Sequence, residues 1–169
     1  MGALLAKENI WYVGTQDPNL RVFDIIMHSD WGTSYNAYLV KGSEKTALFE
    51  TSKLEFFDEF LANVREVCDP ASIDYIVVDH TEPDHTGSME KLLELAPNAT
   101  VLGSATALNF LKQIVNHDFT CRAVTEKDTV DLGGMTLHFL SVPFLHWPDS
   151  MYTYIPEAKA LFTCDSFGC

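Results

Sequence analysis

The sequence predicts an α/β fold, an α+β sandwich in which helices cover the outer faces of β-sheets. Up to residue 50, short runs of β-branched and aromatic residues alternate with turn residues, which is typical of antiparallel strands. From residue 56 to 115, apolar residues recur at helical spacing and alternate with short strand-like runs, and strand patterns alone return from residue 121. This order differs from a run of pure βαβ units, so we expect packed sheets rather than a single doubly wound sheet.

Length and charge limit the classes of protein to which the chain can belong. With 169 residues, it is long enough for one domain with its own core. Its net charge of −13 argues against nucleic acid or an acidic membrane as a partner, because both favour a basic surface. The N-terminus lacks a signal-peptide pattern, and no run approaches the roughly 18 apolar residues of a spanning helix. We therefore expect a cytoplasmic protein without a membrane partner.

Two further motif classes find no support in the sequence. The four cysteines (Cys68, Cys121, Cys164 and Cys169) form no C-x-x-C pair, which argues against a zinc ribbon or a rubredoxin-like iron site. Reduced thiols in a cytosolic protein are the simplest interpretation. Neither G-x-G-x-x-G nor G-x-x-x-x-G-K-[ST] follows a strand, so nucleotide binding within this chain is unsupported.

The first part of the chain is expected to form strands and then one helix. We predict strands at residues 10–13, 20–27, 35–40 and 46–50. A turn is expected at residues 16–19, and the connection at 41–44 has the length and the glycine of a hairpin. The apolar residues from Phe56 to Val67 recur at helical spacing, and Asp69-Pro70 ends this helix.

The remaining elements follow from the same two patterns. We predict helices at 88–95, with Ser88 as the N-cap, and at 106–115. A buried strand is expected at 73–78, and further strands at 100–102, 121–124, 129–132, 135–142, 152–155 and 160–163. Gly133-Gly134 indicates a tight turn between two of these strands.

Four residues that can bind a metal lie within six positions, directly after the buried strand at 73–78. They are His80, Glu82, Asp84 and His85. Such α/β folds place ligands at the carboxyl ends of strands, and Pro83 keeps the residue before it out of the helical region. Imidazole and carboxylate together are plausible ligands of a transition metal. The alternative is a solvated polar loop with two incidental histidines.

Two more residues of ligand type follow apolar strands further along the chain. His146 comes after the strand at 135–142, and Asp165 follows the strand at 160–163. Taken alone, His146 is equally well explained as a packed core histidine, and Asp165 is better explained as a turn or cap residue. The argument for a metal site therefore rests on the whole set of six residues.

These segments resemble the metallo-β-lactamase-like domain of flavodiiron proteins, the A-type flavoproteins that reduce dioxygen to water or nitric oxide to nitrous oxide. The similar segments are His80-x-Glu82-x-Asp84-His85, Phe144 to Met151, Cys164 to Gly168 and, near the start, Gly32 to Val40. Most hydrolases of the wider superfamily have H-x-H-x-D-H, and Glu82 in place of the second histidine is typical of the diiron branch. The resemblance implies an αββα fold.

The resemblance also implies a ligand set. His80, Glu82 and His146 would bind one iron, Asp84 and His85 the other, and Asp165 would bridge the two. Two Fe²⁺ ions bring four positive charges and the three carboxylates bring three negative ones, so one bridging hydroxide would make the site neutral. Two metals about 3.5–4 Å apart can hold a small diatomic molecule between them. His28 and Trp147 would line the pocket, although His28 is equally well explained as a surface histidine.

The chain departs from the family pattern in two ways, both of which imply partners. A further histidine ligand of the second iron and a flavodoxin-like domain with FMN are absent from these 169 residues. We expect the chain to represent the domain without its C-terminal third, which would leave the apolar faces of strands 135–142 and 160–163 uncovered. A complementary polypeptide or a head-to-tail homodimer would supply what is missing. Rubredoxin or a reduced flavin carrier would act as the electron donor.

Two other functions remain open from the sequence. One is a dinuclear zinc hydrolase of the same fold, in which a metal-bound hydroxide acts as the nucleophile. The other is a non-catalytic module, a scaffold or binding subunit, that keeps the fold without the activity. Glu82 argues against the hydrolase, and metal analysis after anaerobic purification separates it from the diiron protein.

Overall fold

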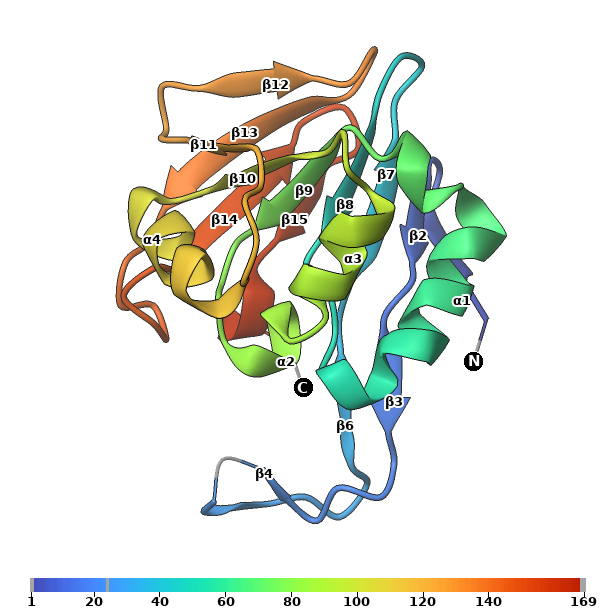
Figure 1. Ribbon diagram of the computed structural model, residues 1–169, viewed down its shortest axis with the longest axis vertical. Coiled ribbons are helices and arrows are strands. Elements are labelled where there is room, and N and C mark those ends of the chain that lie inside the picture. The colour runs from blue at the N-terminus through green and yellow to red at the C-terminus, as the bar shows by residue number, and fades with distance from the viewer. Residues whose placement is uncertain (1, 24, 168–169) are drawn as a thin grey trace.

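The computed structural model describes residues 2–23 and 25–167, which form a layer of helices and two layers of β-strands (Figure 1). Helices α1 (Phe57–Val67), α3 (Met89–Leu95) and α4 (Ala105–Ile114) cover one face of a seven-stranded sheet. A four-stranded sheet packs on the opposite face. The α+β sandwich expected from the sequence is confirmed.

The larger sheet combines an antiparallel half with a parallel half. Its strands are β1 (Leu4–Lys7), β2 (Ile10–Tyr12), β7 (Tyr38–Lys41), β8 (Thr46–Phe49), β9 (Tyr75–Val78), β10 (Thr100–Gly103) and β11 (Cys121–Ala123), in that spatial order. Neighbours are antiparallel from β1 to β8 and parallel from β8 to β11. Val77 lies opposite both Phe49 and Leu102, so β8, β9 and β10 end at the same edge of the sheet.

Helix α1 follows directly from the apolar spacing of its sequence. Phe57, Phe60 and Val64 fall on one face and are buried against the larger sheet. Asp58 lies in the first turn, where a negative charge offsets the helix dipole. The helix ends at Val67, and Cys68 takes an extended conformation, so the expected bounds are confirmed to within one residue.

The two later helices begin in different ways. The Ser104 hydroxyl accepts a hydrogen bond from the backbone N–H of Ala107 at 3.0 Å and caps α4. Ser88 precedes α3 but makes no such cap, because its hydroxyl donates to the backbone oxygen of Lys53 at 3.1 Å. The predicted capping role of Ser88 is therefore wrong. Short helical segments complete the set: α2 (Pro83–Thr86), η1 (Leu54–Phe56), η2 (Pro70–Ser72) and η3 (Cys164–Ser166).

The smaller sheet is antiparallel, and its inner face is buried against the larger sheet. Its strands are β12 (Thr129–Asp131), β13 (Thr136–Ser141), β14 (Met151–Ile155) and β15 (Ala160–Phe162). Leu137 and Phe139 of β13 are almost fully buried, and the Phe162 ring of β15 stacks on Phe49 of β8 at 4.0 Å. The expectation that the apolar faces of these strands are uncovered is wrong for their inner faces. Only outward-facing side chains such as Leu140 are exposed.

Two short hairpins extend from the edge of the larger sheet at which β8 and β9 end (Figure 1). They pair β3 (Thr15–Asp17) with β6 (Thr33–Tyr35), and β4 (Val22–Phe23) with β5 (Met27–His28). The single strand predicted for residues 20–27 is therefore wrong, because the chain reverses within it. Ile25 has a φ of 72° in this turn, and Asp24 lies outside the described residues. The apolar side chains on which the strand prediction rested are exposed to solvent. Ile25 is 91% exposed and Ile26 is 85% exposed.

Most other element boundaries agree with the sequence prediction to within a few residues, but β1 was not predicted, and β3 occupies part of the turn expected at residues 16–19. The strand expected at 35–40 is interrupted at Asn36, which separates β6 from β7. Gly133 and Gly134 join β12 to β13 with φ values of 86° and 79°, a conformation that favours glycine. The thiols of Cys68, Cys121 and Cys164 are free, and Cys169 lies outside the described residues. None of the helices within residues 2–23 and 25–167 combines the length and apolar character that a membrane crossing requires.

The burial of β13 against the larger sheet predicts a difference between its two faces. Leu137 is fully buried and Leu140 is 40% exposed on the same strand. We expect Leu137→Ala to lower the free energy of unfolding by about 2–5 kcal/mol, because it leaves a cavity between the sheets. Leu140→Ala should cost about 1 kcal/mol or less. Urea unfolding of the two variants checks this, and equal losses would contradict the assignment of the inner face.

Candidate metal centre

Three segments that are distant in sequence meet at one edge of the two sheets. The first contains residues 79–86 and leaves the carboxyl end of β9. The second connects β13 to β14 and carries His146, and the third follows β15 and carries Asp165. All six residues singled out in the sequence come together here, as two groups of potential ligands within reach of one another.

The segment after β9 is partly helical rather than a plain loop. Glu82 has φ −58° and ψ 147°, and the short helix α2 begins at Pro83, as expected from the restriction that proline places on the residue before it. The Thr86 hydroxyl donates to the backbone oxygen of Thr81 at 2.9 Å. The backbone N–H of Thr51 donates to the backbone oxygen of His85 at 2.8 Å. These contacts hold four ligand-type side chains of one segment in a single arrangement.

The first group consists of His80, Glu82, His146 and Asp165, whose ligand atoms all lie within 4.8 Å of one another. Glu82 Oε2 lies 3.1 Å from His80 Nε2 and 3.0 Å from His146 Nε2. His80 is fully buried, whereas the His146 side chain is 40% exposed. His80 therefore lies on the interior side of the site, and His146 lies on the side that faces solvent.

The second group consists of Asp84, His85 and Asp165, again with ligand atoms within 4.8 Å of one another. His85 Nε2 lies 2.8 Å from Asp165 Oδ1 and 3.8 Å from Asp84 Oδ2. The other oxygen of Asp165, Oδ2, lies 3.9 Å from His146 Nε2 of the first group. Asp165 thus belongs to both groups and presents a different oxygen to each.

The electrostatics of the site reflect an excess of buried negative charge. Burial raises the pKa of Asp84 above its usual value. Burial also raises the pKa of Asp165, but the hydrogen bond and charge of His85 outweigh it and leave that pKa below its usual value. Burial lowers the pKa of His85, yet Asp165, Glu50 and Asp84 together raise it to about 9. In the protein alone, a proton on His85 therefore compensates the surrounding carboxylates.

Strained backbone is concentrated around the site. Glu50, Phe144, His146 and Cys164 have φ values of 59°, 65°, 87° and 42°, a region that residues other than glycine rarely adopt. Each lies on a segment that carries or supports one of the ligand-type side chains. Such strain costs on the order of 1–3 kcal/mol per residue and persists where packing and hydrogen bonds impose it.

A cavity of about 400 Å³ leads from the surface to both groups. Asp84, His146 and Asp165 form part of its wall, and Phe23 and His28 of the β4–β5 hairpin form another part. His28 thus lines the cavity, but its side chain is 71% exposed and lies 3.3 Å from Asp30, so it is both a pocket and a surface residue. The Trp147 ring lies edge-on to the His80 ring at 5.1 Å.

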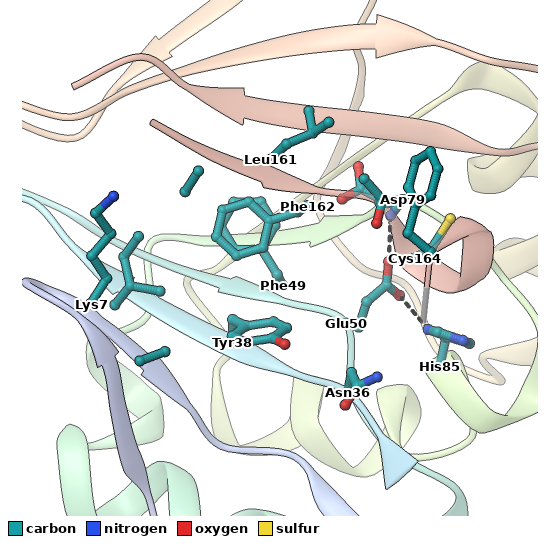
Figure 2. Close-up of a pocket in the computed structure, with 15 residues that line it drawn as sticks. Lys7, Asn36, Tyr38, Phe49, Glu50, Asp79, His85, Leu161, Phe162 and Cys164 are labelled. Atoms are coloured by element: carbon teal, nitrogen blue, oxygen red, sulfur yellow. Dashed lines mark hydrogen bonds and ion pairs between the residues drawn. The ribbon is translucent and has the colours of Figure 1, made fainter. Parts of the chain in front are cut away.

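The structure adds three buried carboxyl residues that the sequence reasoning did not single out: Glu50, Asp79 and Asp149. Glu50 Oε1 accepts a hydrogen bond from the backbone N–H of Asp79 at 2.7 Å (Figure 2). Asp79 Oδ1 accepts one from the Thr153 hydroxyl at 2.8 Å. Burial raises the pKa of Glu50 well above its usual value and that of Asp79 to about 8. For Glu50 and Asp79, the signal available in the sequence was an acidic residue at the end of a predicted strand.

Comparison with known proteins assigns the chain and its fold to a family. A sequence profile of the ODP family of β-lactamase domains matches residues 33–169. The flavo-diiron protein FprA2 of Clostridium acetobutylicum is 50% identical over 171 residues, which cover the whole of this chain. The chain belongs to the flavodiiron protein family. Its fold is the metallo-β-lactamase-like fold of that family, as the resemblance implied.

Two solved flavodiiron structures have the same fold. The flavodiiron protein of Giardia intestinalis superposes with a TM-score of 0.91 at 33% identity and covers 96% of this chain. Rubredoxin oxygen:oxidoreductase of Desulfovibrio gigas superposes with a TM-score of 0.88 at 36% identity and covers 94%. This chain spans 42% of the Clostridium relative and 40% of each of these two structures.

The donor set of this flavodiiron chain fits a pair of metal ions. The buried Asp84 Oδ1 has no hydrogen-bond partner among the described residues, and such an atom is costly unless a cation or donor reaches it. Imidazole nitrogens and carboxylate oxygens point into one space from two groups that share a carboxylate. This combination suits first-row transition metals, whereas a site for Mg²⁺ or Ca²⁺ would consist mainly of oxygen ligands.

The shared position of Asp165 predicts the effect of its removal. Asp165→Asn keeps the shape of the side chain but removes the charge between the two groups, so the chain should lose most of one metal per site. Metal analysis after loading with Fe²⁺ under anaerobic conditions measures this. Asp58→Asn, an exposed acid on α1, is the matched control and should bind as much iron as the parent. Unchanged iron content in Asp165→Asn would show that Asp165 does not bridge.

The raised pKa of His85 predicts that metal binding at the second group depends on pH. A metal needs the unprotonated Nε2, and the proton leaves His85 only at a pKa of about 9. Below that value, affinity should rise by about tenfold per pH unit, because one proton competes with the metal. Zn²⁺ titrations in a chelator buffer between pH 6.5 and 8 test this slope. An affinity that stays constant over this range would contradict it.

Proposed function

We propose that the chain provides the diiron centre of a flavodiiron oxidoreductase that reduces dioxygen to water, nitric oxide to nitrous oxide, or both. The observation that carries the proposal is the carboxylate of Asp165, which belongs to two adjacent groups of imidazole and carboxylate donors. The relatives support the reaction class. One structural relative is named a rubredoxin oxygen:oxidoreductase, and a relative from Moorella thermoacetica is named a nitric oxide reductase.

Each ligand-type residue has a distinct role in this proposal. His80, Glu82 and His146 hold one iron, Asp84 and His85 hold the other, and Asp165 bridges them. When bound, the two irons would transfer electrons from the flavin to the diatomic substrate. The protein residues hold the metals at the end of the cavity between Asp84 and His146, where a small molecule can enter from solvent. Trp147 packs against His80 and limits the rotation of that ring.

Protons for the reaction must reach the site from solvent. Reduction of dioxygen to water or of nitric oxide to nitrous oxide consumes protons as well as electrons. His28, on the exposed hairpin at the mouth of the cavity, lies where a side chain can exchange protons with both solvent and the cavity. We assign His28 to this entrance and not to the metal ligands, because it belongs to neither ligand group.

The proposal includes partners that supply electrons and a further ligand. FMN on a flavodoxin-like domain, on the same protein or on a head-to-tail partner subunit, would pass electrons from rubredoxin or another carrier to the irons. A second cavity of about 310 Å³ opens beside His85, with Tyr38 and Leu161 in its wall (Figure 2). A complementary polypeptide could bring another imidazole to the second iron from the opposite side of the His85 ring, where Asp84 and Asp165 lie.

A dinuclear zinc hydrolase of the same fold is the main alternative. Glu82 argues against it, because the carboxylate stands where most hydrolases of the superfamily have a second histidine. Purification under anaerobic conditions followed by metal analysis distinguishes the two. About two irons per chain support the oxidoreductase, and two zinc ions with esterase or lactamase activity support the hydrolase. A chain that binds neither metal supports a non-catalytic module.

The assignment of FMN to a flavodoxin-like domain in this proposal predicts that the 169 residues alone require a second component. Iron does not accept a hydride from NADH directly, and a flavin is the usual carrier between the two. The iron-loaded 169-residue chain should therefore consume neither dioxygen nor nitric oxide with NADH alone. Addition of a flavodoxin-like domain with FMN and its reductase should start consumption, which an oxygen or nitric oxide electrode measures. Steady consumption with NADH alone would contradict the proposal.

A further inference from the structure

Four buried polar atoms near the metal centre lack hydrogen-bond partners and face one another in pairs. The four atoms are Nδ1 of His80, Oδ1 of Asp149, Nδ1 of His85 and Oε2 of Glu50. His80 Nδ1 lies 3.5 Å from Asp149 Oδ1, and His85 Nδ1 lies 3.8 Å from Glu50 Oε2. Buried polar atoms are nearly always paired in folded proteins, so a small closing movement that forms both hydrogen bonds satisfies all four atoms.

Asp149 is held in place behind His80 by the loop that also carries His146. Its Oδ2 accepts a hydrogen bond from the Thr81 hydroxyl at 2.6 Å, and its backbone oxygen accepts one from the Ser104 hydroxyl at 3.0 Å. The Asp149 side chain is fully buried, as is that of His80. The carboxylate therefore has one oxygen anchored and the other directed at the imidazole, on the side opposite to Glu82.

Glu50 occupies the equivalent place behind His85. Its Oε1 is anchored by the backbone N–H of Asp79 at 2.7 Å, and its Oε2 is directed at His85 (Figure 2). The backbone of Glu50 lies in the left-handed region, with a φ of 59°, at the end of β8. His85 Nε2, on the other side of the ring, faces Asp165.

We infer that Asp149 and Glu50 are positioning residues, one for each metal, that hold the His80 and His85 rings with Nδ1–H toward a carboxylate and Nε2 toward the metal. The inference rests on the proposed function, because it assumes that the Nε2 atoms are ligands. A carboxylate that accepts the Nδ1–H fixes the ring orientation and raises the electron density at Nε2. The two carboxylates are on different loops, so each should act on its own metal.

The inference predicts a reciprocal effect of two conservative substitutions on Zn²⁺ binding. Asp149→Asn should weaken the affinity of the His80 group by about 10–100-fold and leave the His85 group unchanged. Glu50→Gln should do the opposite. Zn²⁺ is diamagnetic, so titration of ¹⁵N-labelled chain reports each imidazole separately by NMR. A variant that weakens both groups equally, or neither, would overturn the inference.

A matched control distinguishes positioning from general loss of buried charge. Asp79→Asn removes a carboxylate that is equally buried at the same strand ends but hydrogen-bonds to Thr153 and not to an imidazole. This variant should bind Zn²⁺ at both groups as the parent does. If it weakens either group as strongly as Asp149→Asn or Glu50→Gln, the effect is not specific to the paired carboxylates and the inference fails.

A second measurement, hydrogen exchange in the metal-free chain, tests the inference independently of the proposed function. In the metal-free parent chain, the Nδ1–H protons of His80 and His85 should exchange slowly with solvent, because each donates to a buried carboxylate. Asp149→Asn should accelerate exchange at His80 only, and Glu50→Gln at His85 only. Fast exchange at both rings in the parent would overturn the inference even if Zn²⁺ binds. If the Nδ1–H protons exchange slowly but the chain does not bind Zn²⁺, the result contradicts only the proposed metal centre.

Discussion

The concentration of buried acidic residues at one edge of the two sheets is the constraint on which the rest of the structure depends. Carboxylates are costly to bury unless cations or hydrogen-bond donors compensate them. Some of these residues are compensated by hydrogen-bond donors, as Asp79 is by the Thr153 hydroxyl. Others, such as Asp84, retain an oxygen without a partner among the described residues. A pair of metal ions would resolve this imbalance, whereas protons would resolve it only in part.

The two sheets make this concentration of charge possible. Strand β9 supplies four ligand-type side chains at its carboxyl end, and β13 and β15 of the smaller sheet direct two more to the same edge. The backbone N–H of Met151 donates to the backbone oxygen of Asp79 at 2.8 Å and joins the sheets beside the site. The stacked rings of Phe49 and Phe162 hold them together further along. The apolar packing therefore sets the separation of the ligand-bearing loops.

The two ring nitrogens of the buried histidines have different partners. One nitrogen of His80 and of His85 faces the ligand groups, and the other faces a buried carboxylate. His146 differs, because its ring lies on an exposed loop with a strained backbone. Two histidines of ligand type thus have a buried carboxylate behind the ring, whereas the third lies on an exposed loop. The more exposed third histidine also borders the cavity through which substrate would enter.

The sequence by itself determined the element types, the four ligand-type residues after β9, and the family, because these depend on local periodicity and on short motifs. It failed at residues 20–27, where apolar side chains imitate a buried strand but belong to an exposed hairpin that no sheet covers. It also did not single out Glu50 and Asp149, since a carboxylate acquires such a role only when folding buries it behind an imidazole. The tertiary structure alone decided which oxygen faces which ring, because those pairs join residues 35 and 69 positions apart, from Glu50 to His85 and from His80 to Asp149.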